Sequence, residues 1–244
     1  PPPPPLFSRI RRNTRSASSS RGLGDVYKRQ AQQSVRDLSG AVAGRLRIAT
    51  SHHIGLHRLP PVLSAFSEAY GAVQLDIDFM DSEQAYELIM QGKAEIAVVT
   101  LAPVREASIV TLPLWPDPLD FMVARHHPLA RHRGLDLQAL SEHTAILPGL
   151  NTYTGQIVAR LFEQHRLALQ VSMATNYLET IRMMASVGLG WTVLPRSMSD
   201  PSLATLKIGG IRIERTLGIV YHRGRSLSRA AQAFVEVLRD PAGV

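Results

Sequence analysis

The polar residues Ser51, His52 and His53 follow a segment that is typical of a strand (44–50) and precede one that is typical of a helix (56–70). Apolar residues alternate in the first segment and recur at three and four residue steps in the second. Backbone N–H groups and the positive dipole end at such a helix start can hold an anion or a carboxylate. The pattern therefore predicts a small-molecule site at this loop.

The two histidines give this loop a possible pH-dependent charge. Small environmental shifts move a histidine across physiological pH, and an imidazolium would favour an anionic ligand. We therefore expect that His53→Ala weakens ligand binding and leaves the melting temperature nearly unchanged. The alternative is that Ser51 only caps the helix and that both histidines are surface groups.

Three other junctions supply candidate ligand contacts. Thr100 ends the apolar strand predicted at 96–100, and the carboxyl ends of strands border the crevice in open α/β sheets. Helices predicted at 154–165 and 177–187 begin next to further polar residues, namely Thr152, Tyr153, Thr154, Asn176 and Tyr177. Each of these side chains could instead cap a turn or a helix. Trp191 follows Gly190 at a strand start, where core packing is the favoured interpretation.

Several kinds of chemistry are disfavoured or excluded. The chain has no cysteine, which excludes disulfides, thiolate nucleophiles and Cys-based zinc sites. The sequence contains no G-x-S-x-G elbow, P-loop or G-x-G-x-x-G fingerprint, so we expect no enzyme and no cofactor. No metal site is expected either, because the remaining histidines lack ligand spacing; they are His126, His127, His132, His143 and His165.

The net charge of +7 belongs to the N-terminal part of the chain. Eight of the 27 basic residues and one of the 20 acidic residues lie in residues 1–36, so the remainder is neutral. Residues 1–29 are rich in Pro, Ser, Arg and Gly, which predicts disorder. This stretch is either a phosphate-binding arm or a non-native leader resembling translated adapter sequence, and we favour the leader. Residues 30–44 are interpreted as the end of a linker helix.

Beyond residue 44, strands alternate with helices, which predicts a mainly parallel α/β sheet. Prolines at 113, 116 and 118 precede a strand predicted at 119–124, where the chain is expected to enter a second α/β set. No run approaches the roughly 18 apolar residues that cross a bilayer, and no secretory h-region is present. We therefore expect a cytoplasmic protein that spans no membrane.

Four segments together resemble a known family. In order and spacing, LRIATSHHIGLHRLPPVLSAFSEAY, ELIMQGKAEIAVVT, DFMVARHHPLA and YLETIRMMASVGLGWTVLP are similar to the effector-binding domain of bacterial LysR-type transcriptional regulators. The resemblance implies an α/β fold of two Rossmann-like lobes with a ligand cleft between them, as in type 2 periplasmic binding proteins. Lobe I would comprise residues 45–118 plus 218–244, and lobe II residues 119–217.

The resemblance also implies a function and partners. The domain would sense a small anionic metabolite in the cleft, form homodimers or tetramers, and signal to a DNA-binding domain. The residues before Gln30 have neither the length nor the apolar pattern of a winged helix-turn-helix, so we expect DNA contact only through a domain missing here. A solute-binding protein of a transporter is the alternative, and an enzyme on the same fold is third. Family members usually have small hydroxyl residues where this chain has His52 and His53.

Overall fold

A computed structural model describes residues 42–132 and 134–240 of the 244-residue chain. The leader expected at 1–29 and most of the linker helix expected at 30–44 lie outside the described residues.

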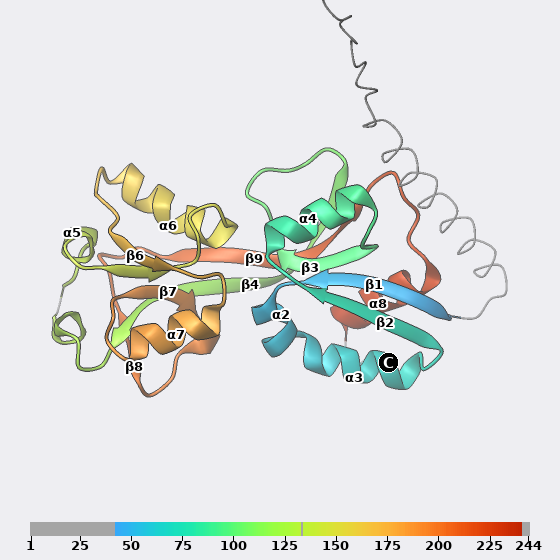
Figure 1. Cartoon of the computed structure of the whole chain (residues 1–244), viewed down its shortest axis with the longest axis horizontal. Helices are drawn as coiled ribbons and strands as arrows, with labels where there is room; N and C mark the ends of the chain where they lie inside the picture. Colours follow the sequence, from blue (N-terminus) through green and yellow to red (C-terminus); the bar gives the residue numbers. More distant parts are fainter. Residues whose placement is uncertain (1–41, 133, 241–244) are drawn as a thin grey trace, which may run out of the picture. The chain divides into compact units, whose positions relative to one another are not determined.

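The described residues form an alternating series of strands and helices (Figure 1). The strands are β1 (Gly44–Thr50), β2 (Val73–Phe79), β3 (Ile96–Thr100), β4 (Ile109–Ala124), β5 (Ala145–Leu147), β6 (Val171–Ala174), β7 (Thr192–Pro195), β8 (Leu203–Leu206) and β9 (Ile213–His222). The α-helices are α2 (His52–His57), α3 (Leu59–Ala69), α4 (Ser82–Gln91), α5 (Leu137–Ser141), α6 (Tyr153–Gln164), α7 (Leu178–Ser186) and α8 (Arg229–Arg239). Two short 3₁₀ turns cover Pro128–Arg131 and Arg196–Met198.

The main sheet is mixed, which corrects the expectation of a mainly parallel sheet. Its order is β2-β1-β3-β9-β4-β7, with β8 also paired to β4. The pairs β1–β2 and β1–β3 are parallel, whereas β9 and β4 pair antiparallel with each other and with their other neighbours. The local strand and helix pattern could not show this, because β4 and β9 are joined through about ninety intervening residues.

The long strands β4 and β9 run through both lobes of the fold (Figure 1). We call β1–β3 with α2–α4 and α8 the first lobe, and β5–β8 with α5–α7 the second lobe. The strand expected at 119–124 in fact begins at Ile109. Residues 109–118 pair with β9 on one side only, because β7 and β8 pair with residues 119–124. Pro113, Pro116 and Pro118 are tolerated there, since no second described strand requires a backbone N–H from them.

Each lobe has its own hydrophobic core on both faces of its strands. In the first lobe, one cluster packs α2, α3 and α8 on one face of the sheet, and a second cluster packs α4 on the other face. In the second lobe, one cluster packs α5 and α6 and another packs α7. Trp191 is fully buried in the cluster with α6, where its ring stacks on Phe162, so its interpretation as a core residue is confirmed.

The local sequence pattern predicted some elements accurately but did not predict that the helix expected at 56–70 is broken. The strand expected at 96–100 matches β3, and the helix before it, α4, ends at Gly92 with a left-handed φ of 69°. The expected helix at 56–70 is instead divided at Arg58 into α2 and α3, because Pro60 and Pro61 cannot continue a preceding helix. Leu56, which the single-helix pattern placed on the buried face, is 59% exposed.

Candidate functional site

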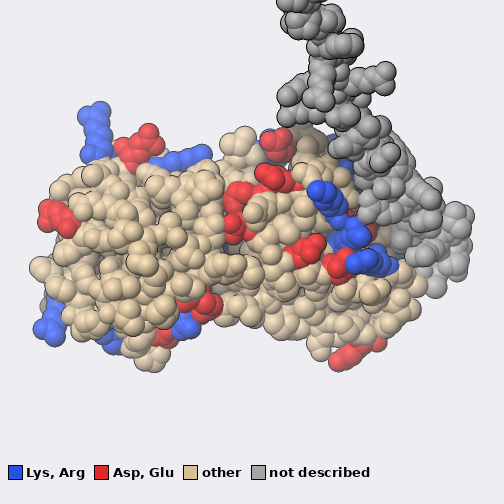
Figure 2. All heavy atoms as spheres, viewed as in Figure 1, with Lys and Arg blue, Asp and Glu red and all other residues tan. Residues whose placement is uncertain are grey.

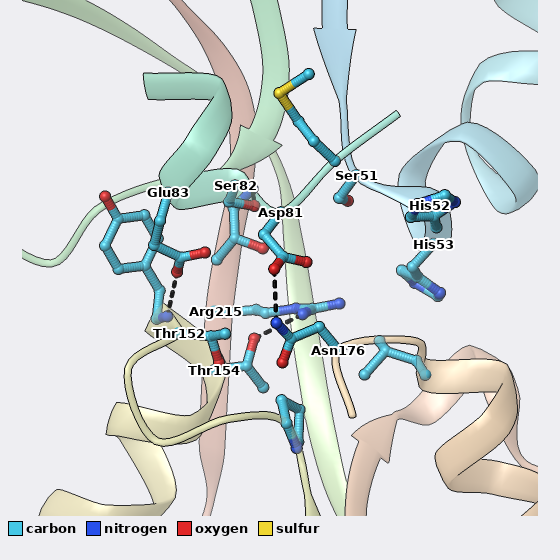
Figure 3. A pocket seen from close by; sticks show the side chains of 15 residues that line it. Ser51, His52, His53, Asp81, Ser82, Glu83, Thr152, Thr154, Asn176 and Arg215 are labelled. Atoms are coloured by element: carbon cyan, nitrogen blue, oxygen red, sulfur yellow. Dashed lines mark hydrogen bonds between the residues drawn. The ribbon is translucent and has the colours of Figure 1, made fainter. Parts of the chain in front are cut away.

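A pocket lies between the two lobes and is lined by residues of both (Figure 3). It holds about 460 Å³ of space free of protein atoms, its open mouth included. The lining residues are Ser51, His52, His53, Met80, Asp81, Ser82, Glu83, Thr100, Pro148, Thr152, Tyr153, Thr154, Asn176, Leu178 and Arg215.

The first-lobe side of the pocket is the carboxyl edge of three neighbouring strands. Because β1 and β2 are parallel and Thr50 is paired with Phe79, the loops that follow both strands open at one edge. The Met80 N–H donates to the Thr50 carbonyl at 3.0 Å, which holds these loops together. Thr100, at the end of β3, is buried at the same edge. This arrangement follows the general rule for ligand sites in open α/β sheets.

Eight of the nine predicted contact residues line this one pocket. They are Ser51, His52, His53, Thr100, Thr152, Tyr153, Thr154 and Asn176. The ninth, Tyr177, is not among the lining residues; it is 53% exposed and its ring lies 4.7 Å from the His52 ring. The prediction that these residues contact a ligand remains a prediction.

The structure differs from both expectations for the helix start at Ser51, which were an anion site at the helix dipole and a capping role for the Ser51 hydroxyl. Ser51 occupies the N-cap position of α2, but its hydroxyl makes no capping hydrogen bond. The helix is only six residues long, so its dipole offers an anion less than a longer helix would. Ser51 is therefore a polar group on the pocket wall without a capping role.

His53 is buried, which corrects both interpretations of it. It is 6% exposed, so it is not a surface group. Burial, with the nearby Arg215 charge, lowers the pKa of His53 to about 3, so the ring is neutral near pH 7 and supplies no imidazolium. Within the described part of the chain, neither of its buried ring nitrogens has a hydrogen-bond partner.

The second-lobe side is built on the start of α6. Thr152 is the N-cap, and its hydroxyl accepts from the Gly155 N–H at 3.1 Å. The Tyr153 N–H donates to the carboxylate of Glu83, which reaches across from the first lobe. A carboxylate of the protein therefore occupies the helix start where an anionic ligand was expected.

A second carboxylate links the lobes through an amide. Asp81 caps α4 and accepts from Nδ2 of Asn176 at 2.6 Å, while Oδ1 of Asn176 accepts from the Gly149 N–H at 3.0 Å. Figure 3 shows Asn176 directed toward Asp81 across the pocket. Asn176 thus ties the loop before α6 to the start of α4.

Arg215 is the cation of the pocket and is itself held by buried partners. Its Nε donates to Oδ2 of Asp117 at 2.8 Å and its Nη1 donates to the Thr154 hydroxyl at 2.8 Å. Arg58 approaches the same carboxylate at 3.7 Å. Among the described residues, Nη2 of Arg215 has no hydrogen-bond partner, so a ligand could still receive a hydrogen bond from it.

Sequence reasoning did not identify the charged residues of the pocket. Asp81 and Glu83 could have been found, because they lie after β2, which pairs parallel with β1, at the N-cap and in the first turn of α4. Arg215 could not be found in this way, because it lies near the start of β9 and reaches the pocket only through the long-range pairing of β9 with β4. Pro148 and Leu178 were also missed.

No group of three or more His, Asp or Glu residues able to hold a metal ion occurs within residues 42–132 and 134–240. Of the histidines set aside earlier, His127 and His143 lie with their rings 5.3 Å apart and away from the pocket-lining residues. In the same residues, no helix has the length and hydropathy needed to cross a bilayer.

Two α/β lobes that share crossing strands and enclose a polar pocket define a small-molecule-binding domain. The sequence matches the LysR substrate binding domain over residues 39–242, and the chain belongs to this family. It is therefore the effector-binding domain of a LysR-type transcriptional regulator, with the type 2 periplasmic-binding-protein-like fold.

Known proteins agree with this assignment. The chain is 25% identical to the RuBisCO operon transcriptional regulator of Allochromatium vinosum, covering 91% of this chain and 74% of that protein. It is 24% identical to the transcriptional activator CmpR of Synechocystis, covering 96% and 80%. The CcmR regulatory domain of Synechocystis, solved in complex with 2-PG, superposes with a TM-score of 0.72 at 25% identity, covering 80% and 96%. These relatives are transcriptional regulators, so the transporter alternative is not supported.

Proposed function

We propose that the pocket binds a small effector carrying an anionic group and that this binding changes the activity of an attached DNA-binding domain. The observation that carries the proposal is the convergence on one pocket of polar residues from both lobes around the buried Arg215. The CcmR domain, similar in fold and 25% identical, is described in complex with 2-PG, a small anion. We propose further that the domain acts in the cytoplasm as a sensor and not as an enzyme.

The nine predicted residues, together with Arg215, are proposed as the effector contacts. We also propose that the lobes divide as expected, with residues 45–118 plus 218–244 in lobe I and 119–217 in lobe II. Effector binding would shift the population of lobe arrangements by the difference in its affinity for them. The polar bonds from Glu83 to Tyr153 and from Asp81 to Asn176 already join the lobes, so an effector entering between them would replace or rearrange these bonds.

A ligand screen tests the site. Thermal melting of the 244-residue chain is measured against a panel of small carboxylic acids and their phosphate esters, because a ligand that binds only the folded state raises the melting temperature. Ser51→Ala should weaken binding of any hit, with an unchanged melting temperature in its absence, because the Ser51 hydroxyl makes no capping bond. Thr205→Val, at an exposed position on β8 in the second lobe, is the control. If a hit binds Ser51→Ala and Thr100→Val as tightly as it binds the wild type, the ligand lies elsewhere.

We propose that the domain forms a side-by-side dimer through α3 and α7. Family members act as oligomers. Exposed apolar side chains support a contact on this side: Met183 is 53% and Val187 58% exposed near the end of α7, and Leu56 is 59% exposed next to α3. Figure 1 shows α2, α3 and α7 on the same side of the described residues.

Light scattering coupled to size-exclusion chromatography tests the dimer. Val187→Glu should convert a dimer to a monomer, because a charge would be buried against an apolar face. Val104→Glu, at a 71% exposed position in the loop after β3, should leave the mass unchanged. A monomeric wild type at high concentration would contradict the dimer without affecting the proposed ligand site.

A further inference from the structure

The charged groups of the pocket set a chemical requirement on what it can hold. Among the lining residues, two carboxylates, Asp81 and Glu83, face a single guanidinium, Arg215, which is paired at 2.8 Å with Asp117, a carboxylate that Arg58 also approaches at 3.7 Å. Figure 2 shows acidic side chains gathered beside α4 on the face in view. The lining therefore carries more negative than positive charge, although the family relationship alone suggests an anionic ligand.

Both carboxylates act as hydrogen-bond acceptors between the lobes. Asp81 accepts from the Asn176 amide and Glu83 from the Tyr153 N–H, so each is held by one donor of the second lobe. An ionised carboxylate has about four acceptor positions, so both can accept further donors from a ligand. They cannot donate while ionised, and a phosphate or second carboxylate next to them would meet like charge without a bridging proton.

The uncharged lining residues His53 and Ser51 also favour a ligand that carries hydrogen-bond donors and acceptors. His53 is 94% buried, being 6% exposed, and both of its ring nitrogens lack a partner among the described residues. A neutral imidazole has one N–H donor and one acceptor nitrogen, so a hydroxyl group, which both donates and accepts, can satisfy either one. Ser51 adds a hydroxyl that makes no capping bond.

We propose that Asp81 and Glu83 make this pocket selective for a monocarboxylate that carries hydroxyl or ammonium groups, and that they reject phosphate esters of the same skeleton. This inference rests on the proposed function of the pocket. The ligand's single carboxylate would face Nη2 of Arg215, and its donors would face the two acidic side chains. Asp81 and Glu83 are thus specificity residues, since a ligand donor would replace or join the Asn176 and Tyr153 donors from which they accept.

Matched ligand pairs provide the test. Calorimetric titration of the 244-residue chain compares glycerate with 3-phosphoglycerate, serine with phosphoserine, and shikimate with shikimate 3-phosphate, so that each pair differs by one phosphate. For any pair that binds, the unphosphorylated member should bind about tenfold or more tightly, because opposing like charges is costly in a buried site. In Asp81→Asn and Glu83→Gln this preference should fall toward one or reverse.

Two controls separate local charge from net charge. Glu87→Gln removes a charge from the exposed face of α4, and Asp78→Asn removes one from the exposed end of β2. Both should keep the wild-type preference. Tighter binding of the phosphorylated members by the wild type would overturn the selectivity and leave the proposed site intact. Equal preferences in wild type and in both pocket variants would also overturn it. Failure of every compound, including the wider panel, would count against the proposed function itself.

Discussion

Asp117 and Arg215 are register partners on β4 and β9, and their side chains form an ion pair of 2.8 Å with 2% and 6% of each side chain exposed. Arg215 lines the pocket, and Asp117 holds its guanidinium, which also donates to Thr154. The same strands carry the chain from one lobe to the other. Within the described residues, Arg215 is the only Lys or Arg that lines the pocket. A change in the twist of these strands would therefore also move the guanidinium of Arg215.

Breaking this pair should be costly. Asp117→Asn keeps the side-chain volume but leaves Arg215 buried without its counter-charge, so the free energy of unfolding should fall by about 3–5 kcal/mol. Urea denaturation followed by circular dichroism measures the change. Asp120→Asn, which breaks an ion pair with the largely exposed Arg196, should have little effect. Similar losses in both variants would show that burial does not distinguish the two pairs.

His53 should make the domain less stable as the pH falls. The unfolded chain binds a proton on this residue below about pH 6.5, whereas the folded chain, whose pKa for His53 is lowered to about 3, does not. The contribution of His53 to stability is therefore full above pH 6.5 and is lost by roughly 1.4 kcal/mol for each pH unit between there and about pH 3. Between pH 7 and 5, the wild type should lose about 2 kcal/mol more than His53→Leu. Unfolding curves of His132→Gln, at an exposed position, should follow the wild type; identical pH slopes in wild type and His53→Leu would contradict the prediction.

Gly155 should tolerate no side chain. A Cβ there would lie 2.2 Å from the carbonyl oxygen of Gly149, a backbone atom that cannot rotate away. Gly155→Ala should therefore destabilise the start of α6 by roughly 1–3 kcal/mol and weaken effector binding, as measured by thermal melting and titration. Gly71→Ala, whose Cβ meets nothing nearer than 3.7 Å, is the matched control. An unchanged melting temperature in Gly155→Ala would mean that the loop before α6 can move.

The sequence was sufficient for features that depend on neighbouring residues. The capping pattern of Asp81 and Gln84 and the stop at Gly92 define α4, and the polar residues after β1 and before α6 mark both walls of the pocket. Features that depend on distant pairing were not predictable in this way. The antiparallel β4–β9 ladder, the start of β4 ahead of its prolines, and the position of Arg215 in the pocket all follow from contacts about 100 residues apart in sequence.

Burial was equally hard to foresee. His53 lies one residue after His52 and has the same side chain, yet only His53 is nine-tenths buried. Its charge state follows from that burial and from the nearby Arg215 charge, which both lower its pKa. A residue type and its spacing can therefore indicate a site without indicating the protonation state in which the site works.

The β4–β9 ladder also determines how the lobes can move. Ten register pairs from Ile109–His222 to Leu119–Ile213 continue through the junction between the two cores, interrupted only by the irregularity between Pro113 and Trp115. The twist between paired strands varies over a wide range and is larger in two-stranded ribbons. We therefore expect a ligand in this pocket to change the twist of the β4–β9 strand pair. The rest of the protein would then sense ligand binding as a rotation of one lobe relative to the other.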